Sequence, residues 1–313
     1  MQTFLPYPDF ARSAASLDRV RLGKQRVETL QILRALVIPD YGWRSHPAVR
    51  MWMGHVPALT RYGLAMADEW VRRGGRDSTR ANILEFAPQV DVPKPANLAA
   101  YARVDAAMDL PSEVDSEAPG WLGDPELHRS HRSNLIRKDP DYYGAQFPGE
   151  APGLEYVWPE PARVLLPREP GPDRIWILRM ATGGQLESGE HFGAGLFGGD
   201  HYRGHLDPAN PDRWPAGVHL AKDAANGRRS PKRQRQVQAF LDCVDIGQRI
   251  AVPVENGRRF ISATVSGPAE EQQPGILVRP VEVGTLVDRD TFGYPALLQD
   301  PRVFFAVPAP LTA

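Results

Sequence analysis

The chain has 313 residues, of which 42% are hydrophobic and 24% are charged, a composition typical of soluble globular proteins. Its formal net charge of −1 excludes a globally basic nucleic-acid coat, so any contact with nucleic acid must come from a local patch. The single cysteine, Cys243, excludes an internal disulfide framework and is expected to be a packed thiol. No signal peptide and no apolar run of roughly 20 residues is present, which favours a cytoplasmic protein without membrane contact.

The first half of the chain has helical periodicity. Its spacing predicts a helix over 17–37, with apolar residues on one side, namely Val20, Val27, Leu30 and Val37. A second helix is expected over 48–71, and it ends before the glycine pair at 74–75. A weaker helix is expected over 97–108, followed by an acidic, solvent-exposed loop over 109–120.

Residues 127–144 combine positive charge with aromatic rings in the sequence LHRSHRSNLIRKDPDYYG. Basic side chains can contact phosphates and tyrosines can stack on an exposed base, as single-stranded or flipped nucleotides require. The candidates for contact with DNA in this segment are Arg129, His131, Arg132, Arg137, Lys138, Tyr142 and Tyr143. His128 and His131 have a spacing that could hold a metal, but no matching ligand set lies nearby, so neither a metal nor another cofactor is expected.

The second half of the chain has a different pattern. Prolines crowd 148–172, which predicts an extended linker, and the glycine-rich segment 183–202 is expected to be a mobile loop. Short apolar runs predict strands at barrel-like spacing over 174–180, 217–221, 248–255, 258–267 and 275–283, interrupted by a basic helix over 230–244. The predicted fold class is α+β, with a helical domain over 1–147, the linker, and a β-barrel domain over 173–313.

Three side chains of the helix over 17–37 project from one arc of its surface: Arg21, Lys24 and Glu28. A carboxylate beside an amine can move protons while an imine forms and breaks down. The same spacing also describes an ordinary surface ion pair between Lys24 and Glu28, so the residues alone leave both interpretations open.

Three blocks of sequence within roughly 1–147 resemble the pyrimidine-dimer DNA glycosylase (endonuclease V) family: MQTFLPYPDF…LDRVRLGKQRVETLQIL, HPAVRMWMGH…YGLAMADEWVRRGGRD and HRSHRSNLIRKDPDYYG. The resemblance implies a compact helical enzyme that flips a nucleotide, attacks the sugar C1′ with a free amine and cleaves the strand through a covalent imine. It makes Arg21 and Arg26 candidates for phosphate binding and Glu28 the candidate acid/base. Val27 separates Arg26 from Glu28, whereas the family has an arginine and a glutamate side by side.

Two amines are candidates for the nucleophile. Better-known family members use an α-amine exposed by removal of the initiator methionine, but the bulky Gln2 is expected to leave Met1 in place. The alternatives are therefore the α-amine of Met1 and the side chain of Lys24. Met1 is favoured, because an α-amine is unprotonated at neutral pH far more often than a lysine side chain.

The second half, through RIWILRM and RQRQVQAFLDCVDIGQRIAVPVENGRRFISATVSG, resembles the PUA-like/EVE barrel. Such modules resemble readers that take a modified base into an aromatic-lined pocket, and the pocket candidates are Trp176, Phe192, Trp214 and Phe260. Each of these rings could equally be part of the barrel core.

The resulting hypothesis is a DNA glycosylase with AP-lyase activity that flips and removes a damaged or modified pyrimidine, while the barrel recognises the base or its surroundings. The alternative is a non-catalytic reader of modified DNA or RNA bases. The sequence leaves open which base is recognised, the oligomeric state, and whether the setting is DNA repair or phage defence.

Overall fold

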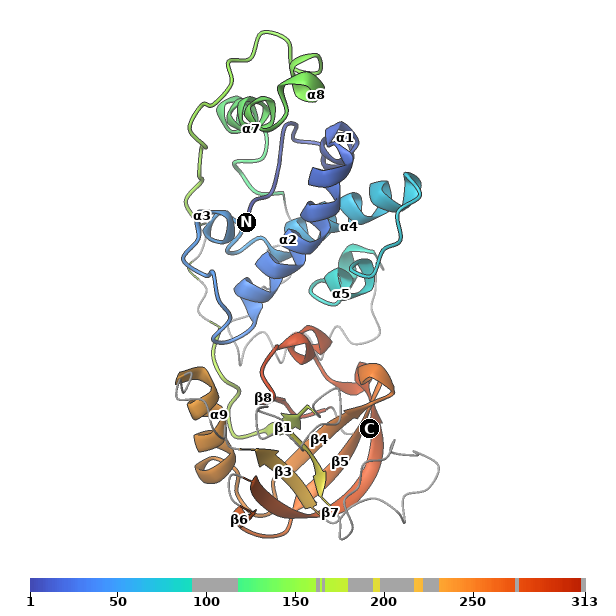
Figure 1. Cartoon of the computed structure of the whole chain (residues 1–313), viewed down its shortest axis with the longest axis vertical. Helices are drawn as coiled ribbons and strands as arrows, with labels where there is room; N and C mark the ends of the chain where they lie inside the picture. The colour runs from blue at the N-terminus through green and yellow to red at the C-terminus, as the bar shows by residue number, and fades with distance from the viewer. Residues whose placement is uncertain are drawn as a thin grey trace. The chain divides into compact units, whose positions relative to one another are not determined.

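The computed structural model describes residues 1–91, 118–161, 164, 167–179, 194–197, 217–221, 231–273 and 276–310. The chain divides into two compact units, Met1–Arg168 (unit 1) and Glu169–Ala313 (unit 2). The fold is α+β, with helices α1 to α8 drawn from blue to green in Figure 1 and strands in unit 2. No helix in the described ranges is both long enough and apolar enough to cross a bilayer. The predicted helix over 97–108, Phe192 and Trp214 lie outside the described residues.

Unit 1 is helical. Its elements are α1 (Phe10–Ser16), α2 (Arg19–Val37), α3 (Pro47–Arg50), α4 (Val56–Arg72), α5 (Arg80–Leu84), the short 3₁₀ helix η1 (Pro88–Val90), α7 (Pro125–Lys138) and α8 (Pro140–Gly144). Both α1 and α2 pack against α4. The single helix expected over 48–71 is wrong, because a turn at Gly54, whose φ of 86° favours glycine, separates α3 from α4.

Helix α2 follows the prediction in its extent but not in its buried face. It begins after Asp18, whose carboxylate accepts hydrogen bonds from the backbone N–H groups of Val20 and Arg21. Leu30 and Val37 are buried, but Val20 is 60% exposed and Val27 is 44% exposed. The prediction for these two valines was wrong because the buried face of α2 includes polar residues, Gln25 and Thr29 among them, which a search for apolar periodicity passes over.

The C-terminal helices of unit 1 hold part of the proline-rich segment. Leu154 donates its backbone N–H to Ser133 Oγ of α7 at 2.8 Å, and Asn134 Nδ2 donates to the carbonyl of Leu154 at 2.7 Å. Further along, the N–H of Val157 donates to Ser130 Oγ at 3.2 Å. Residues 154–157, which were expected to lie in a linker, therefore run along α7 and are held there by three of its polar side chains.

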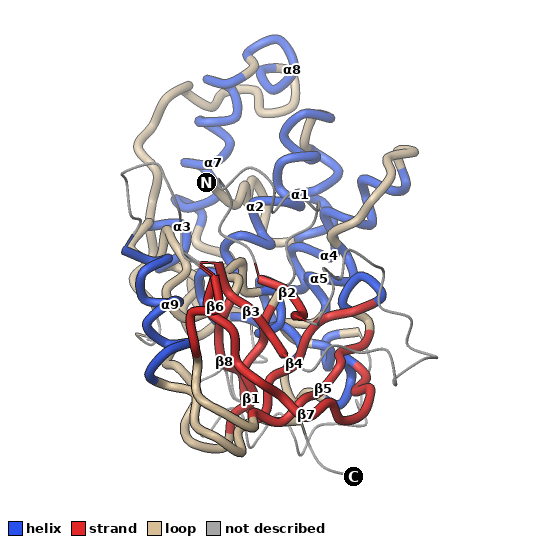
Figure 2. The backbone as a smooth tube through the Cα atoms, turned by 60° about the horizontal axis from the view of Figure 1, so that its bottom comes forward, coloured by secondary structure: helices blue, strands red, loops and turns tan. Residues whose placement is uncertain are grey.

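Unit 2 is built on a sheet of eight described strands: β1 (Arg174–Leu178), β2 (Ala194–Phe197), β3 (Gly217–Ala221), β4 (Arg249–Val254), β5 (Arg259–Val265), β6 (Glu270–Gln273), β7 (Ile276–Asp288) and β8 (Phe304–Pro308). The order is β2-β3-β7-β5-β4-β1-β8, and β6 pairs with β7. The β1–β4 pair is parallel and the other pairs are antiparallel. The strands form a curled half-barrel (Figure 2). The predictions did not include β2, β6 or β8, and β2 lies within the segment expected to be a loop.

The core of unit 2 is formed mainly by aliphatic and aromatic side chains. Helix α9 (Pro231–Asp242) buries Phe240 against Phe304, with ring centroids 5.2 Å apart, and Trp176 stacks on Phe304 at 4.8 Å. Short 3₁₀ helices occur at η5 (Glu255–Gly257), η6 (Arg289–Thr291) and η7 (Pro295–Gln299). Cys243 was expected to be packed, but it is exposed because it directly follows the last turn of α9.

Candidate active site at the N-terminal segment

The N-terminal segment, residues 1–5, lies along α2 and is held there by Gln25. The side-chain oxygen of the fully buried Gln25 accepts hydrogen bonds from the Phe4 backbone N–H at 2.8 Å and from the Tyr62 hydroxyl at 2.5 Å. Its side-chain nitrogen donates to the carbonyl of Gln2 at 3.0 Å and to Glu28 Oε2 at 3.1 Å. One buried amide thus joins the start of the chain to α2 and α4.

Glu28 faces the start of the chain. The backbone N–H of Gln2 donates to Glu28 Oε2 at 3.1 Å, which brings half-buried Met1 beside the same carboxylate. Lys24 is exposed and makes no ion pair with Glu28. Of the three predicted catalytic residues, the structure therefore brings together Met1 and Glu28, while the surface ion pair between Lys24 and Glu28 is not formed.

Two histidines of α7 hold the other end of the segment. His128 Nδ1 donates to the carbonyl of Leu5 at 2.7 Å while its Nε2 accepts from the N–H of Gly123 at 3.1 Å, and His131 Nδ1 accepts from the N–H of Leu5 at 3.2 Å. Burial, and secondly His128, lowers the pKa of His131 to about 3, so this ring is neutral. His131 was predicted to contact DNA, but a fully buried ring cannot reach a phosphate, and it positions Leu5 instead.

His46 lies near the same amine and carboxylate. Its Nδ1 accepts from the N–H of Ala48 at 3.1 Å and so caps α3. Burial lowers the pKa of His46, the positive N-terminus lowers it further, and Glu28 opposes the shift. His46 therefore lies close enough to both groups for their charges to act on it, although the sequence analysis did not select it.

Tyr156 also lies beside the N-terminal segment. Burial is the main reason that the pKa of Tyr156 is raised, and the charge of Glu28 raises it further. The Gln2 side chain and the charge of Arg137 act in the opposite direction and lower this pKa. The sequence analysis missed Tyr156 because it read 148–172 as a linker. The signal was available, since disordered segments are poor in aromatic residues and EYVW carries two.

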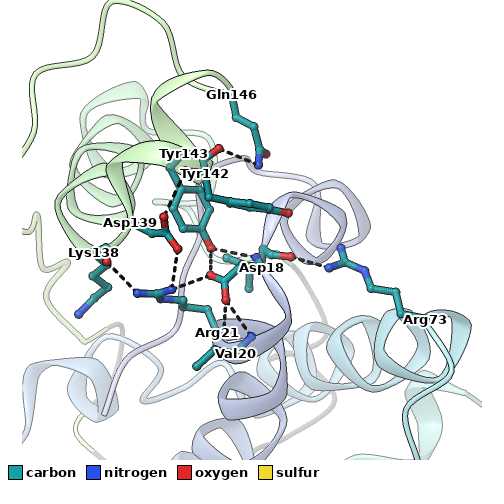
Figure 3. Close-up of polar contacts among 10 residues, drawn as sticks. Asp18, Val20, Arg21, Arg73, Lys138, Asp139, Tyr142, Tyr143 and Gln146 are labelled. Atoms are coloured by element: carbon teal, nitrogen blue, oxygen red, sulfur yellow. Dashed lines mark hydrogen bonds and ion pairs between the residues drawn. The ribbon is translucent and has the colours of Figure 1, made fainter.

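Arg21 and Tyr143, both predicted to contact DNA, instead connect α2 with α7 and α8 (Figure 3). Asp18 accepts from the Tyr143 hydroxyl at 2.5 Å and from Arg21 Nη1 at 3.2 Å, and Arg21 Nη2 donates to the carbonyl of Lys138 at 2.9 Å. Burial would raise the pKa of Asp18, but the hydrogen bond from Tyr143 and the N–H groups of Arg21 and Val20 lower it overall. Tyr143 is buried, so its ring is not available to stack on a base.

Three more predicted phosphate ligands are paired with carboxylates. Arg26 pairs with Asp77, stacks over Trp70 with its guanidinium carbon 4.3 Å from the ring centroid, and is only 11% exposed. Arg129 and Arg132 both pair with Glu150, at 3.2 Å and 2.5 Å. These ion pairs neutralise much of the positive charge that the sequence suggested.

Arg137, Lys138 and Tyr142 remain available at the surface. All three are exposed, and neither Arg137 nor Lys138 forms an ion pair with another described residue. Lys138 Nζ lies 5.8 Å from the centroid of the Phe4 ring, and Arg137 is close enough to influence Tyr156. The free positive charge of α7 therefore lies beside the N-terminal segment. Within the described ranges, no three His, Cys, Asp or Glu side chains gather as they would to hold a metal.

The two described pocket candidates of unit 2 do not come together. Trp176 belongs to the core cluster that also contains Ile261. Phe260 precedes Ile261 on β5, so it points to the opposite face of the sheet, where it packs on Phe292 at 5.0 Å between centroids. Both rings are buried, and they do not line one common pocket.

Comparison with known proteins finds a family similarity in the N-terminal part of the chain. Residues 1–82 match the family model described as pyrimidine dimer DNA glycosylase. The matched range runs from Met1 through α4 into α5, so it includes Glu28 and His46 and ends before α7. The match confirms the resemblance over those residues, which resemble the corresponding part of a DNA glycosylase. No curated protein and no solved structure matches the chain.

Proposed function

We propose that the protein is a DNA glycosylase with abasic-site lyase activity, in which the α-amine of Met1 attacks the sugar C1′ of a damaged or modified pyrimidine nucleotide. The observation that carries the proposal is the hydrogen bond of 3.1 Å from the Gln2 N–H to Glu28 Oε2, within the range that matches the glycosylase family. It holds the first peptide group, and with it the neighbouring amine, against a carboxylate that can accept and return protons.

The reaction balances with the groups present. The amine nitrogen bonds to C1′ while the bond from C1′ to the base breaks, and the base leaves with that electron pair and takes up a proton. The nitrogen then loses a proton, the ring oxygen gains one as its bond to C1′ breaks, and an imine joins Met1 to the opened sugar. Loss of a proton from C2′ expels the 3′ phosphate, and water releases the sugar. Glu28 is the group that relays these protons.

The exposed cations of α7 support a DNA substrate. Arg137 and Lys138 carry positive charge that no described carboxylate neutralises, and both lie next to the N-terminal segment. Phosphates flanking the attacked nucleotide can bind there, while the overall charge of −1 keeps binding local. Tyr142, exposed on α8, can stack on a base nearby.

We further propose that unit 2 is a PUA-like barrel that binds the base or its surroundings. The resemblance of β1, α9, β4 and β5 to that fold supports this, as does the half-barrel formed by the sheet. Because Trp176 and Phe260 are core residues on opposite faces, any pocket must use other side chains.

The test is a panel of duplex oligonucleotides that carry ultraviolet photoproducts, hypermodified pyrimidines or an abasic site. We expect release of a base from at least one substrate, strand scission, and a covalent adduct after borohydride reduction. Peptide mapping should place the adduct on the N-terminal residue, whose identity the intact mass of the purified protein establishes. Tight binding without any product would instead favour the non-catalytic reader of modified bases.

A further inference from the structure

Four aromatic side chains from two distant segments form a continuous row beside the candidate active site. Trp43 and His46 precede α3, and Tyr156 and Trp158 follow α8 by more than ten residues. The ring centroids of Trp43 and His46 are 5.9 Å apart, those of His46 and Trp158 are 6.3 Å apart, and those of Trp158 and Tyr156 are 5.2 Å apart. We call these four residues the aromatic row.

The aromatic row is accessible along its length. Trp43 is 63% exposed, and the other three rings are half-buried. The backbone of Trp43 has a φ of 71°, in the left-handed region that a bulky residue rarely adopts. An exposed indole on an unfavourable backbone contributes little to the core, which makes a role in binding the better explanation.

The aromatic row borders the reacting groups. Tyr156 packs edge-on against His131, with ring centroids 5.3 Å apart, and His131 accepts the N–H of Leu5 in the N-terminal segment. The charge of Glu28 acts to raise the pKa of both His46 and Tyr156, which agrees with this placement. A base is joined to C1′ by a single bond, so a base whose C1′ meets the Met1 amine must lie within a few ångströms of that amine. Trp52 and Tyr62 also contact the N-terminal segment but are fully buried, whereas His46 and Tyr156 of the aromatic row are half-buried and can be reached by a base.

We propose that the aromatic row binds the flipped pyrimidine base whose C1′ is attacked, with the rings of Trp43 and Trp158 as its stacking surfaces. The inference rests on the proposed function and names its base-binding residues. Aromatic rings bind an unpaired base through its flat face, an interaction that tolerates modification of the base edge. A row of this kind therefore suits a substrate that differs from an ordinary pyrimidine in its ring substituents.

The experiment compares two substrates that differ only in the base. One duplex carries the pyrimidine that the wild-type protein releases, and the other carries an abasic site at the same position. We expect Trp43→Ala and Trp158→Ala to lower base release by about 5- to 150-fold, the range that a stacking interaction implies. Borohydride trapping on the abasic site should stay within about twofold, because that substrate has no base to stack.

Trp43→Phe is the matched control, because it keeps a ring and should retain most of the base release. Equal loss on both substrates, or no loss with the base-containing one, would overturn the inference. Failure of the wild-type protein on both substrates would instead contradict the proposed function. In that event, binding to a duplex with one unpaired pyrimidine, compared with the same duplex carrying a tetrahydrofuran abasic analogue, still tests the aromatic row. A preference for the pyrimidine that Trp43→Ala removes supports the row, and no preference overturns it.

Discussion

The two units differ in the chemistry that they bury. In its described residues, unit 2 buries a cluster of apolar side chains, and buried Arg279 donates to the backbone carbonyls of Phe240 and Leu241 at the end of α9. Unit 1 also buries Gln25, His128 and His131, and all three bind the N-terminal segment. Buried polar groups are costly unless they are paired, so their convergence on one chain segment indicates that its position matters for function.

The largest expected effect is a loss of base release when Glu28, which binds the N-terminal segment of unit 1, is replaced. Glu28→Gln keeps an acceptor for the Gln2 N–H but removes the proton relay, so base release should fall by roughly 10²- to 10⁴-fold. Single-turnover assays measure the rate, and Glu126→Gln, an exposed change on α7, is the control. An adduct that still forms in Glu28→Gln would support a role in proton transfer, whereas full activity would contradict one.

A second prediction compares the loss of stability when a buried polar side chain is removed from each unit. Gln25→Ala leaves the Phe4 N–H without its acceptor and the Gln2 carbonyl without its donor, at about 1–3 kcal/mol for each buried group left unpaired. The free energy of unfolding should fall by several kcal/mol in a denaturant titration, and borohydride trapping should slow as the amine loses its position. Ser262→Ala, at a buried position of β5, should change the stability by less than about 1 kcal/mol.

The pH dependence of stability should report on His131. Its pKa is about 3 in the folded protein and near 6.5 when unfolded, so the unfolded state binds more protons between these values. Stability should therefore fall as the pH drops below 6.5, by about 2 kcal/mol at pH 5. The lowered pKa of Asp18 affects the stability only at lower pH, because its stabilising contribution is lost below the pKa of the unfolded state, near 3.8.

His131→Asn checks this assignment. Asparagine can accept the Leu5 N–H but does not titrate, so the stability of this variant should vary less between pH 6.5 and 5. An unchanged slope would assign the pH dependence to another group.

A smaller effect separates free cations from paired ones. The double variant Arg137→Ala, Lys138→Ala should lower the salt slope of DNA binding by about 1.8, because each phosphate contact contributes about 0.9. Arg132→Ala, which removes an ion pair to Glu150 and a hydrogen bond to the Pro6 carbonyl, should reduce stability and leave the slope nearly unchanged. Kd values at several salt concentrations give both slopes, and the reverse ranking would make Arg132 the phosphate ligand.

The smallest effect is expected at Lys24. This exposed side chain is not paired with Glu28, so Lys24→Ala should change the rate of adduct formation by no more than about twofold. Peptide mapping of the wild-type adduct provides the direct check, and an adduct on Lys24 would overturn the choice of Met1.

The sequence by itself determined the local elements and the choice of Glu28 as the candidate acid/base. Helix α2 could be predicted because apolar residues such as Leu30 and Val37 recur at helical spacing, and β4 and β5 because short apolar runs end at turn residues. Glu28 could be selected because it lies in a contiguous block of sequence that resembles the glycosylase family. The family match over residues 1–82 includes this block.

Only the tertiary structure decided which charges are free and which rings meet. Arg26, Arg132 and Arg137 are alike in sequence, but Asp77 and Glu150 neutralise the first two from positions 51 and 18 residues away. Trp158 meets His46 across more than a hundred residues. Helical spacing and capping act between near neighbours, so a sequence displays them directly. Ion pairs and ring contacts between distant segments depend on how the chain folds back on itself, which local patterns do not encode.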